Sequence, residues 1–294
     1  MALSAYRLGL EAIETSYNSG VRSDSMVFAD RHLASRLEAA EAHGCEQFAD
    51  AHKRVVPQIQ SAWIKCAGAT VVFDGADSPV TQTFGLGLYE ELSSDALDEI
   101  EGFFQHRGAD VMHEVCPFAG TQTIGLLCSR GYRPIEISNV MYRTVHERCE
   151  PLPANIQVRR VSNVEAELWS SISARGWTHE HPELEGFLRE TGLVFVARED
   201  SPCFLAEIDG VPGAAGALIL HQGVALFGGA ATVPELRRRG LQAALLHARM
   251  MYAADHGCDL AMMVAEAGSN SQRNAERQGF NVAYTRLKWR LTVR

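Results

Sequence analysis

Three consecutive arginines and a glycine form the stretch of this sequence whose residue types and spacing indicate ligand chemistry. Arg237, Arg238, Arg239 and Gly240 follow an apolar segment and precede a long amphipathic one. Backbone N–H groups at the start of a helix have no intrahelical acceptor and carry partial positive charge, so acidic side chains are favoured there. Arginines go against that preference, and a bound polyanion removes the conflict because amides and guanidinium groups can face it together. The stretch predicts a pyrophosphate site at which Gly240 lets the phosphates approach the backbone. A solvated basic loop before a surface helix is the alternative.

Hydrophobic periodicity predicts the elements that position this turn. A hairpin of strands leads into it and a long helix follows. From residue 151 onward we expect strands at 156–161, 193–198, 203–209, 214–221, 224–231, 260–265 and 282–292, and helices at 163–175, 240–256 and 271–278.

The first half of the chain has a similar series of elements. It reads as helices at 28–52, 94–106 and 122–129, strands at 69–73, 111–115 and 135–144, and a second apolar segment at 84–88. Pro151 and Pro153 interrupt any regular element, so we place a boundary between two modules, 1–150 and 151–294. Gly131-Tyr132 and Gly279-Phe280 each follow a short helix and precede a strand, about 150 residues apart. This spacing favours an internal duplication, and hence two similar modules.

Composition excludes several classes of protein. The 294 residues carry a formal net charge of −9, which argues against a nucleic-acid binder. There is no apolar run of the roughly 18 residues that a membrane span needs, and the N-terminus lacks the pattern of a secretory signal. The 7 cysteines are scattered without metal-ligand spacing. We therefore expect a cytoplasmic protein with no membrane partner and no metal site.

The basic turn resembles the acyl-CoA loop of the GNAT superfamily of N-acetyltransferases, whose pattern is [Q/R]-x-x-G-x-[G/A]. Arg237 and Gly240 match this pattern, and Gln242 stands where glycine or alanine is usual. The short helix that ends in Gly279-Phe280 is similar to a second landmark of the superfamily. The resemblance implies a mixed α/β fold of two tandem GNAT-like modules, each a mostly antiparallel mixed sheet flanked by helices. The first module resembles a degenerate copy without a CoA loop.

The resemblance also implies which residues hold acetyl-CoA as acyl donor. Backbone groups of one strand end would hold the pantetheine arm, namely Ala231, Thr232 and Val233. The loop and the following helix start would hold the pyrophosphate, namely Arg237, Arg238, Arg239, Gly240, Leu241, Gln242 and Ala243.

The acid and base of the reaction match the superfamily less well. Its usual tyrosine acid falls on Ala275, and a usual asparagine falls on Gly268, for which Asn270 or Asn274 could substitute. Asn274 is included among the candidate cofactor-binding residues. Glu266, just past a strand, is the candidate acid or base.

The loop between the first two helices of the second module would line the acceptor pocket. Trp177 and His179 are its candidate substrate-binding residues, and His181 and Glu183 lie beside them.

We therefore expect an acetyl-CoA-dependent N-acetyltransferase whose amine attacks the thioester directly. A small-molecule acceptor is favoured over a protein by fold analogy alone, and the sequence does not indicate an oligomeric state. A non-catalytic acyl-CoA sensor is one alternative, favoured by the missing tyrosine. An interaction scaffold that binds no CoA is the other.

Overall fold

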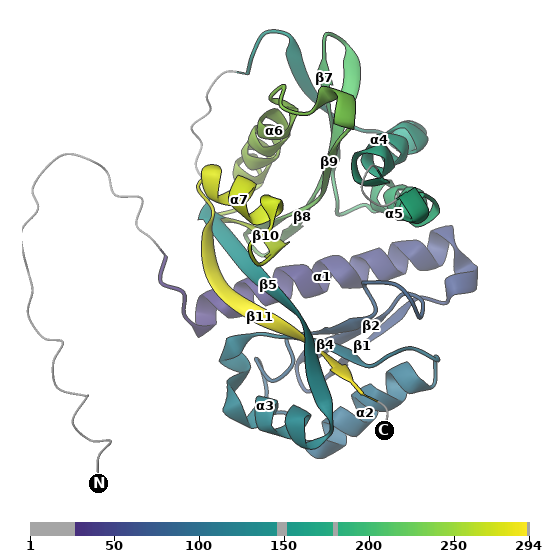
Figure 1. Ribbon diagram of the computed structural model, residues 1–294, viewed down its shortest axis with the longest axis vertical. Helices are drawn as coiled ribbons and strands as arrows, with labels where there is room; N and C mark the ends of the chain where they lie inside the picture. Colours follow the sequence, from purple (N-terminus) through teal and green to yellow (C-terminus); the bar gives the residue numbers. More distant parts are fainter. Residues whose placement is uncertain (1–26, 146–151, 179–181, 293–294) are drawn as a thin grey trace, which may run out of the picture.

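The computed structural model describes residues 27–145, 152–178 and 182–292 (Figure 1). Its helices are α1 (Arg31–Val55), α2 (Ser94–Gln105), α3 (Gly120–Ser129), α4 (Ala166–Thr178), α5 (Glu185–Val196), α6 (Leu241–Asp255) and α7 (Asn270–Arg277). Its strands are β1 (Ala62–Cys66), β2 (Ala69–Phe73), β3 (Gln82–Phe84), β4 (Met112–Val115), β5 (Tyr132–Thr144), β6 (Ile156–Arg160), β7 (Cys203–Ile208), β8 (Val211–His221), β9 (Val224–Thr232), β10 (Leu260–Glu266) and β11 (Asn281–Leu291). Among these residues, no helix is both long and apolar enough to cross a lipid bilayer.

The described strands form one continuous mixed sheet of 11 strands, in the order β1-β2-β3-β4-β11-β5-β10-β9-β8-β7-β6. The pairs β3–β4 and β9–β10 are parallel, and the other neighbours are antiparallel. Each half of the sequence thus contributes an antiparallel run that ends in a parallel pair. This is the mixed α/β fold expected from the sequence.

The two central strands are exchanged between the halves of the sequence. β5, the last strand of the first half, pairs with β10, and β11, the last strand of the second half, pairs with β4. β5 and β11 also pair with each other along most of their length. The halves of the sequence therefore share their central strands in space.

Helices cover both faces of the sheet. α1 lies across the middle of the molecule, and its Leu33 and Leu37 pack against strands of both halves (Figure 1). α5 packs beside α1 and α4 packs on α5, whereas α2, α3, α6 and α7 cover the opposite face. Asp30 caps α1 by accepting a hydrogen bond from the Leu33 N–H at 2.8 Å. Because helices cover both faces of the sheet and successive strand side chains point to opposite faces, alternate residues of the strands enter separate cores.

Most predicted elements are confirmed, and one is wrong. Residues 193–198, expected as a strand, lie mainly in α5. Their apolar, β-branched run suits a buried helix equally well, since periodicity does not separate the two in a short segment. Gly192 decides the packing, because a Cβ there would lie 2.7 Å from the Ser170 Oγ on α4. The apolar segment 84–88 contains only the end of β3, followed by a turn, and β1 was not predicted.

Candidate functional site

The turn before α6 has the backbone conformation of an anion-binding loop. β9 ends at Thr232, a short 3₁₀ turn spans Pro234–Leu236, and Arg237 is extended. Arg238 and Gly240 then adopt positive φ angles of 61° and 88°. A positive φ costs a bulky residue about 1–3 kcal/mol and is concentrated at ligand sites. Left-handed residues in such a loop turn successive N–H groups toward one side, which forms a concave site for anions.

The first turn of α6 has backbone N–H groups without a hydrogen-bond acceptor in the described chain. Gly240 is the N-cap and supplies no side-chain acceptor, and no acidic residue stands in the first turn. The first intrahelical bond runs from the Ala244 N–H to the Gly240 carbonyl at 3.0 Å. The N–H groups of Leu241, Gln242 and Ala243 precede it, and no acceptor for them is found in the described chain. An anion here meets three amides at the positive end of the helix dipole.

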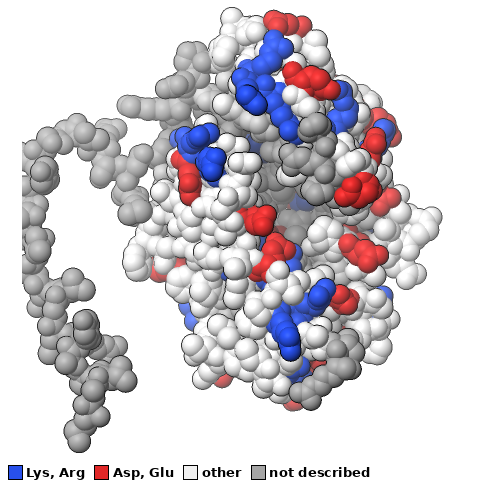
Figure 2. Space-filling model, in the orientation of Figure 1, with Lys and Arg blue, Asp and Glu red and all other residues white. Residues whose placement is uncertain are grey.

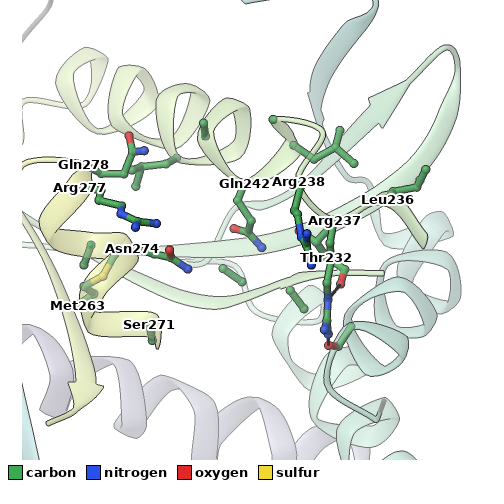
Figure 3. A pocket seen from close by; sticks show the side chains of 18 of the residues that line it. Thr232, Leu236, Arg237, Arg238, Gln242, Met263, Ser271, Asn274, Arg277 and Gln278 are labelled. Carbon is green, nitrogen blue, oxygen red and sulfur yellow. Dashed lines mark hydrogen bonds between the residues drawn. The ribbon is translucent and has the colours of Figure 1, made fainter. Parts of the chain in front are cut away.

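A cavity of about 640 Å³ opens in front of this turn (Figure 3). β9 and the loop line one side with Ala230, Ala231, Thr232, Leu236, Arg237, Arg238 and Gly240; α6 contributes Leu241, Gln242, Ala243, Leu246 and Arg249; α4 contributes Gly176 and Trp177; and β10 and α7 contribute Met263, Ser271, Asn274, Ala275, Arg277 and, just after α7, Gln278. Four arginines line the cavity, and none of these lining residues is acidic. The chain as a whole has a net charge of −9 and shows both basic and acidic side chains on the face in Figure 2, whereas the charged side chains among the described lining residues are all arginines.

The cavity continues into a gap between two strands. β9 and β10 pair in parallel only where Val224–Leu226 lie beside Leu260–Met262. Beyond that point β9 remains paired with β8 alone and β10 with β5 alone. A bulge in β9, with Gly229 at φ 58°, falls just after the point of separation. Bulges bend and twist a strand, so β9 turns away from β10 and leaves an open edge on the cavity.

The structure brings most of the predicted cofactor residues to this cavity. Ala231, Thr232, Arg237, Arg238, Gly240, Leu241, Gln242, Ala243 and Asn274 all line it.

Two of the predicted cofactor residues do not line the cavity. Val233 is 2% exposed, packs in the core under α4, and donates its N–H to the Gly213 carbonyl at 2.9 Å. The Arg239 side chain instead points toward Asp209, with 3.7 Å between nitrogen and carboxylate oxygen. Neither side chain contributes to the cavity wall.

Arg237 connects three parts of the site. Its guanidinium donates to the Thr232 carbonyl at 3.3 Å and to the Gly176 carbonyl at 2.8 Å. It thereby ties the loop to the end of β9 and to α4. Gly176 permits this close packing, because a Cβ there would lie 2.5 Å from the Ala231 Cβ.

Of the predicted acid/base and acceptor-site residues, only Trp177 is found in the described cavity lining. Glu266 ends β10, is exposed and lies outside the cavity lining. Its register neighbour is Ser138 of β5. Trp177 lines the cavity and is 48% exposed. His179 and His181 lie outside the described residues, and Glu183 lies in an exposed turn. The position of the missing tyrosine, Ala275, is buried in the core under α7.

Sequence reasoning missed two cationic residues of the site. Arg277 stands on α7 across the cavity from the loop, and its spacing from Ser271 and Asn274 places the three on one helix face (Figure 3). Arg249 lies on the apolar face of α6, four residues after Leu245, and burial lowers its pKa to about 10. An arginine within an apolar stripe was the signal that could have identified it.

No metal site accompanies the cavity in the described part of the chain, where no group of three or more candidate ligand side chains comes together. The 6 described cysteines are free thiols, and burial raises the pKa of Cys203 to about 12. The donors that the described lining residues offer to a ligand are therefore backbone N–H groups, guanidinium groups, the hydroxyls of Thr232 and Ser271, the Trp177 indole and the amides of Gln242, Asn274 and Gln278.

Comparisons with known proteins agree with this geometry. Residues 164–280 match the family model described as Acetyltransferase (GNAT) family. The fold is similar to a GCN5-related N-acetyltransferase from Kribbella flavida, with TM-score 0.59, 17% identity, and 83% of this chain and 96% of that chain covered. A tandem GNAT protein from the clavulanic acid biosynthesis pathway, solved without AcCoA, gives TM-score 0.55 and 12% identity over 77% and 79% of the two chains. A GCN5-related N-acetyltransferase from Sphaerobacter thermophilus gives 0.50 and 16% over 85% and 91%. The search of curated proteins finds no match.

Proposed function

Because residues 164–280 match the family model of GNAT acetyltransferases, we propose that this chain binds acetyl-CoA in the cavity between β9 and β10 and transfers the acetyl group to an amine. The observation that supports this proposal most directly is the cavity itself. It begins at a helix N-terminus with unused amides and ends in a gap between parallel strands, and its described lining residues include four arginines and no carboxylate.

The residues present fit the groups of acetyl-CoA. The amides of Leu241, Gln242 and Ala243, with the Arg238 guanidinium, would hold the pyrophosphate. The open edge of β9 near Ala231 and Thr232 would pair with the amides of the pantetheine arm. The thioester would then lie at the narrow end of the gap, close to where β9 and β10 separate.

The chemistry supported by this arrangement is direct attack by an amine on the thioester. Backbone donors of β9 would orient the carbonyl, and binding would hold the two reactants in register. Among the described residues that line the cavity, none is a carboxylate or a tyrosine that could move a proton. The amine would therefore enter deprotonated or lose its proton to water, and the CoA thiolate is a fair leaving group without an acid.

The acceptor belongs to the same proposal. Trp177 stands where the cavity meets the end of α4 and would form one wall of the acceptor site. A small-molecule amine is the acceptor that we propose, with neither nucleic acid nor membrane as partner. The first half of the chain would support the sheet. In its parallel pair β3–β4, strand β3 is followed by a turn whose Leu86 and Leu88 are each 1% exposed, so side chains of the first half occupy the place that corresponds to the cavity.

Calorimetry with acetyl-CoA tests binding, with Gly240→Asp as the variant. A carboxylate placed against the pyrophosphate, at a residue held at φ 88°, should abolish measurable binding. Gly257→Asp is a matched control, because Gly257 also has a positive φ but a Cβ added there would meet no atom within 4 Å. Unchanged affinity in Gly240→Asp contradicts the proposed site.

Thiol release from acetyl-CoA across a panel of amines tests catalysis. A second candidate, a non-catalytic acyl-CoA sensor, is favoured because the lining residues that the structure describes include no carboxylate, histidine or tyrosine that could transfer a proton. Binding without thiol release for any amine would favour the sensor. Release with at least one class of amine would favour the transferase.

A further inference from the structure

Arg249 is a buried cation at the inner wall of the cavity. It is 2% exposed, and its guanidinium donates through Nε to the Leu245 carbonyl at 3.2 Å. Nη1 donates to the Ala217 carbonyl at 3.1 Å and to the Gly228 carbonyl at 3.4 Å. The Phe227 ring lies 4.9 Å from the guanidinium carbon. Among the described residues no carboxylate forms an ion pair with it, and Nη2 has no acceptor.

An unpaired charge in this position is expensive for a fold. Removing a cation from water costs several kcal/mol, which carbonyls and an aromatic face offset only in part. A leucine or methionine on α6 would fill the same space without that cost. Gly216 of β8 leaves room for the guanidinium, since a Cβ there would lie 3.0 Å from the Arg249 Cζ. The fold therefore makes room for the Arg249 guanidinium at a position where an apolar side chain would pack at lower cost.

Arg249 lies at the thioester end of the cavity and away from the phosphate end. It follows Ala243 by six residues, which is about 9 Å along the helix at 1.5 Å per residue. Its partner Gly228 is two residues beyond Leu226, the last β9 residue paired with β10. Leu246, Met263 and Ala230 line the same cavity beside it. The guanidinium therefore borders the gap where the proposed function places the reacting carbonyl.

We propose that Arg249 is a catalytic residue whose Nη2 donates a hydrogen bond to the carbonyl oxygen of the bound thioester. This inference rests on the proposed function. As the amine nitrogen forms the C–N bond, the carbonyl electron pair moves onto oxygen, and the guanidinium stabilises that charge. When the carbonyl re-forms, the C–S bond breaks and its electron pair leaves on sulfur as the CoA thiolate. The proton lost by the amine nitrogen balances this thiolate. A charged donor held in place by the protein acts in the transition state without reorganisation.

The competing explanation is that Arg249 only satisfies carbonyls at the bulge of β9. Both explanations expect Arg249→Met to alter stability, so stability does not separate them. The stretching band of the thioester carbonyl in bound acetyl-CoA separates the two explanations, because that band depends on Arg249 only if Arg249 donates a hydrogen bond to the carbonyl oxygen.

Infrared difference spectroscopy of bound acetyl-CoA, labelled with ¹³C at the thioester carbonyl, provides that readout without an acceptor. In the wild-type chain the carbonyl band should lie at lower wavenumber than in water. Arg249→Met should return the band toward the water value, and Arg249→Lys should restore part of the shift. Arg249→Met should also lower the affinity for acetyl-CoA relative to free CoA, which lacks the carbonyl, about tenfold.

Arg238→Met is the matched control, since it removes a cavity-lining arginine at the phosphate end. It should weaken acetyl-CoA and CoA alike and leave the carbonyl band in place. An unshifted band in the wild-type chain, or a shift of undiminished size in Arg249→Met, overturns the proposal. The wild-type measurement decides even if Arg249→Met does not fold. Failure of the wild-type chain to bind acetyl-CoA overturns the proposed function, and this proposal with it.

Discussion

The exchange of β5 and β11 predicts that neither half of the sequence folds alone. Residues 151–294 expressed by themselves lack β5, so β10 and β11 each lose an antiparallel neighbour. Residues 1–150 lack β11, which lies between β4 and β5. A division at residue 150, natural in the sequence, therefore cuts through the middle of the sheet.

The loss can be estimated from burial. Tyr132, Val140, Met141 and Tyr142 of β5 are each 0–3% exposed. Full burial of a large apolar side chain contributes roughly 1.5–3 kcal/mol, so these four contribute about 6–12 kcal/mol. That is comparable to the whole stability of a typical domain, about 5–15 kcal/mol. Fragment 151–294 should therefore be unfolded at 25 °C.

Fragment 1–150 suffers an electrostatic loss as well. Arg286 of β11 is 2% exposed and forms ion pairs with Glu38 at 3.1 Å, Glu41 at 2.6 Å and Glu114 at 3.1 Å. Burial raises the pKa of Glu38 and of Glu114, and the Arg286 charge opposes that shift. Removing the cation leaves two buried carboxyls unpaired, at a cost of about 3–5 kcal/mol.

Circular dichroism melts and gel filtration of the two fragments, separate and co-expressed, provide the assay. Each fragment alone should show no cooperative melt, whereas co-expression should give a 1:1 complex that melts cooperatively. A full-length chain cleaved after folding, at a protease site inserted within 146–151, is the control and should stay associated. A cooperative melt together with acetyl-CoA binding by fragment 151–294 alone would refute the reasoning.

Three further predictions concern single residues. Gly176→Ala should weaken acetyl-CoA binding and lower stability by about 1–3 kcal/mol, because the new Cβ would lie 2.5 Å from the Ala231 Cβ. Calorimetry and thermal melts test this prediction. Gly186→Ala is the control, since a Cβ added at Gly186 would meet no atom within 4 Å. Arg277→Gln should weaken CoA binding about fivefold at low salt and less at high salt, as for an exposed charge; the same change at Arg273, which lies outside the cavity lining, should have no effect. Burial lowers the pKa of His113 to about 3, so the unfolded chain takes up a proton below about pH 6.5 that the folded chain does not, and stability falls as pH drops through this window. Melts between pH 7 and pH 4 should show a smaller loss for His113→Phe than for the wild-type chain, and an equal loss would contradict this assignment.

Local sequence determined the parts of this protein that depend on neighbouring residues. The apolar period of α6, the turn residues Pro234 and Gly240, and the run of arginines all act within one strand-loop-helix unit. The turn before α6 could therefore be located from the sequence, and most of the residues predicted for a cofactor site line the cavity. The helix end at Gly279-Phe280 could be predicted for the same reason, since Gly279 has a φ of 80°.

Tertiary structure decided what depends on distant pairing. Strand exchange involves β5 and β11, whose apolar patterns suit either position in the sheet, because pairing partners are not encoded in the period of a strand. Residues 193–196 lie in α5, and the close packing of α5 on α4 is possible because position 192 is a glycine. The inner wall of the site depends on Arg249 of α6 meeting Gly228 across a bulge. The local sequence pattern predicts helix faces and turns, but which elements pack or pair with one another is decided only when the whole sheet assembles.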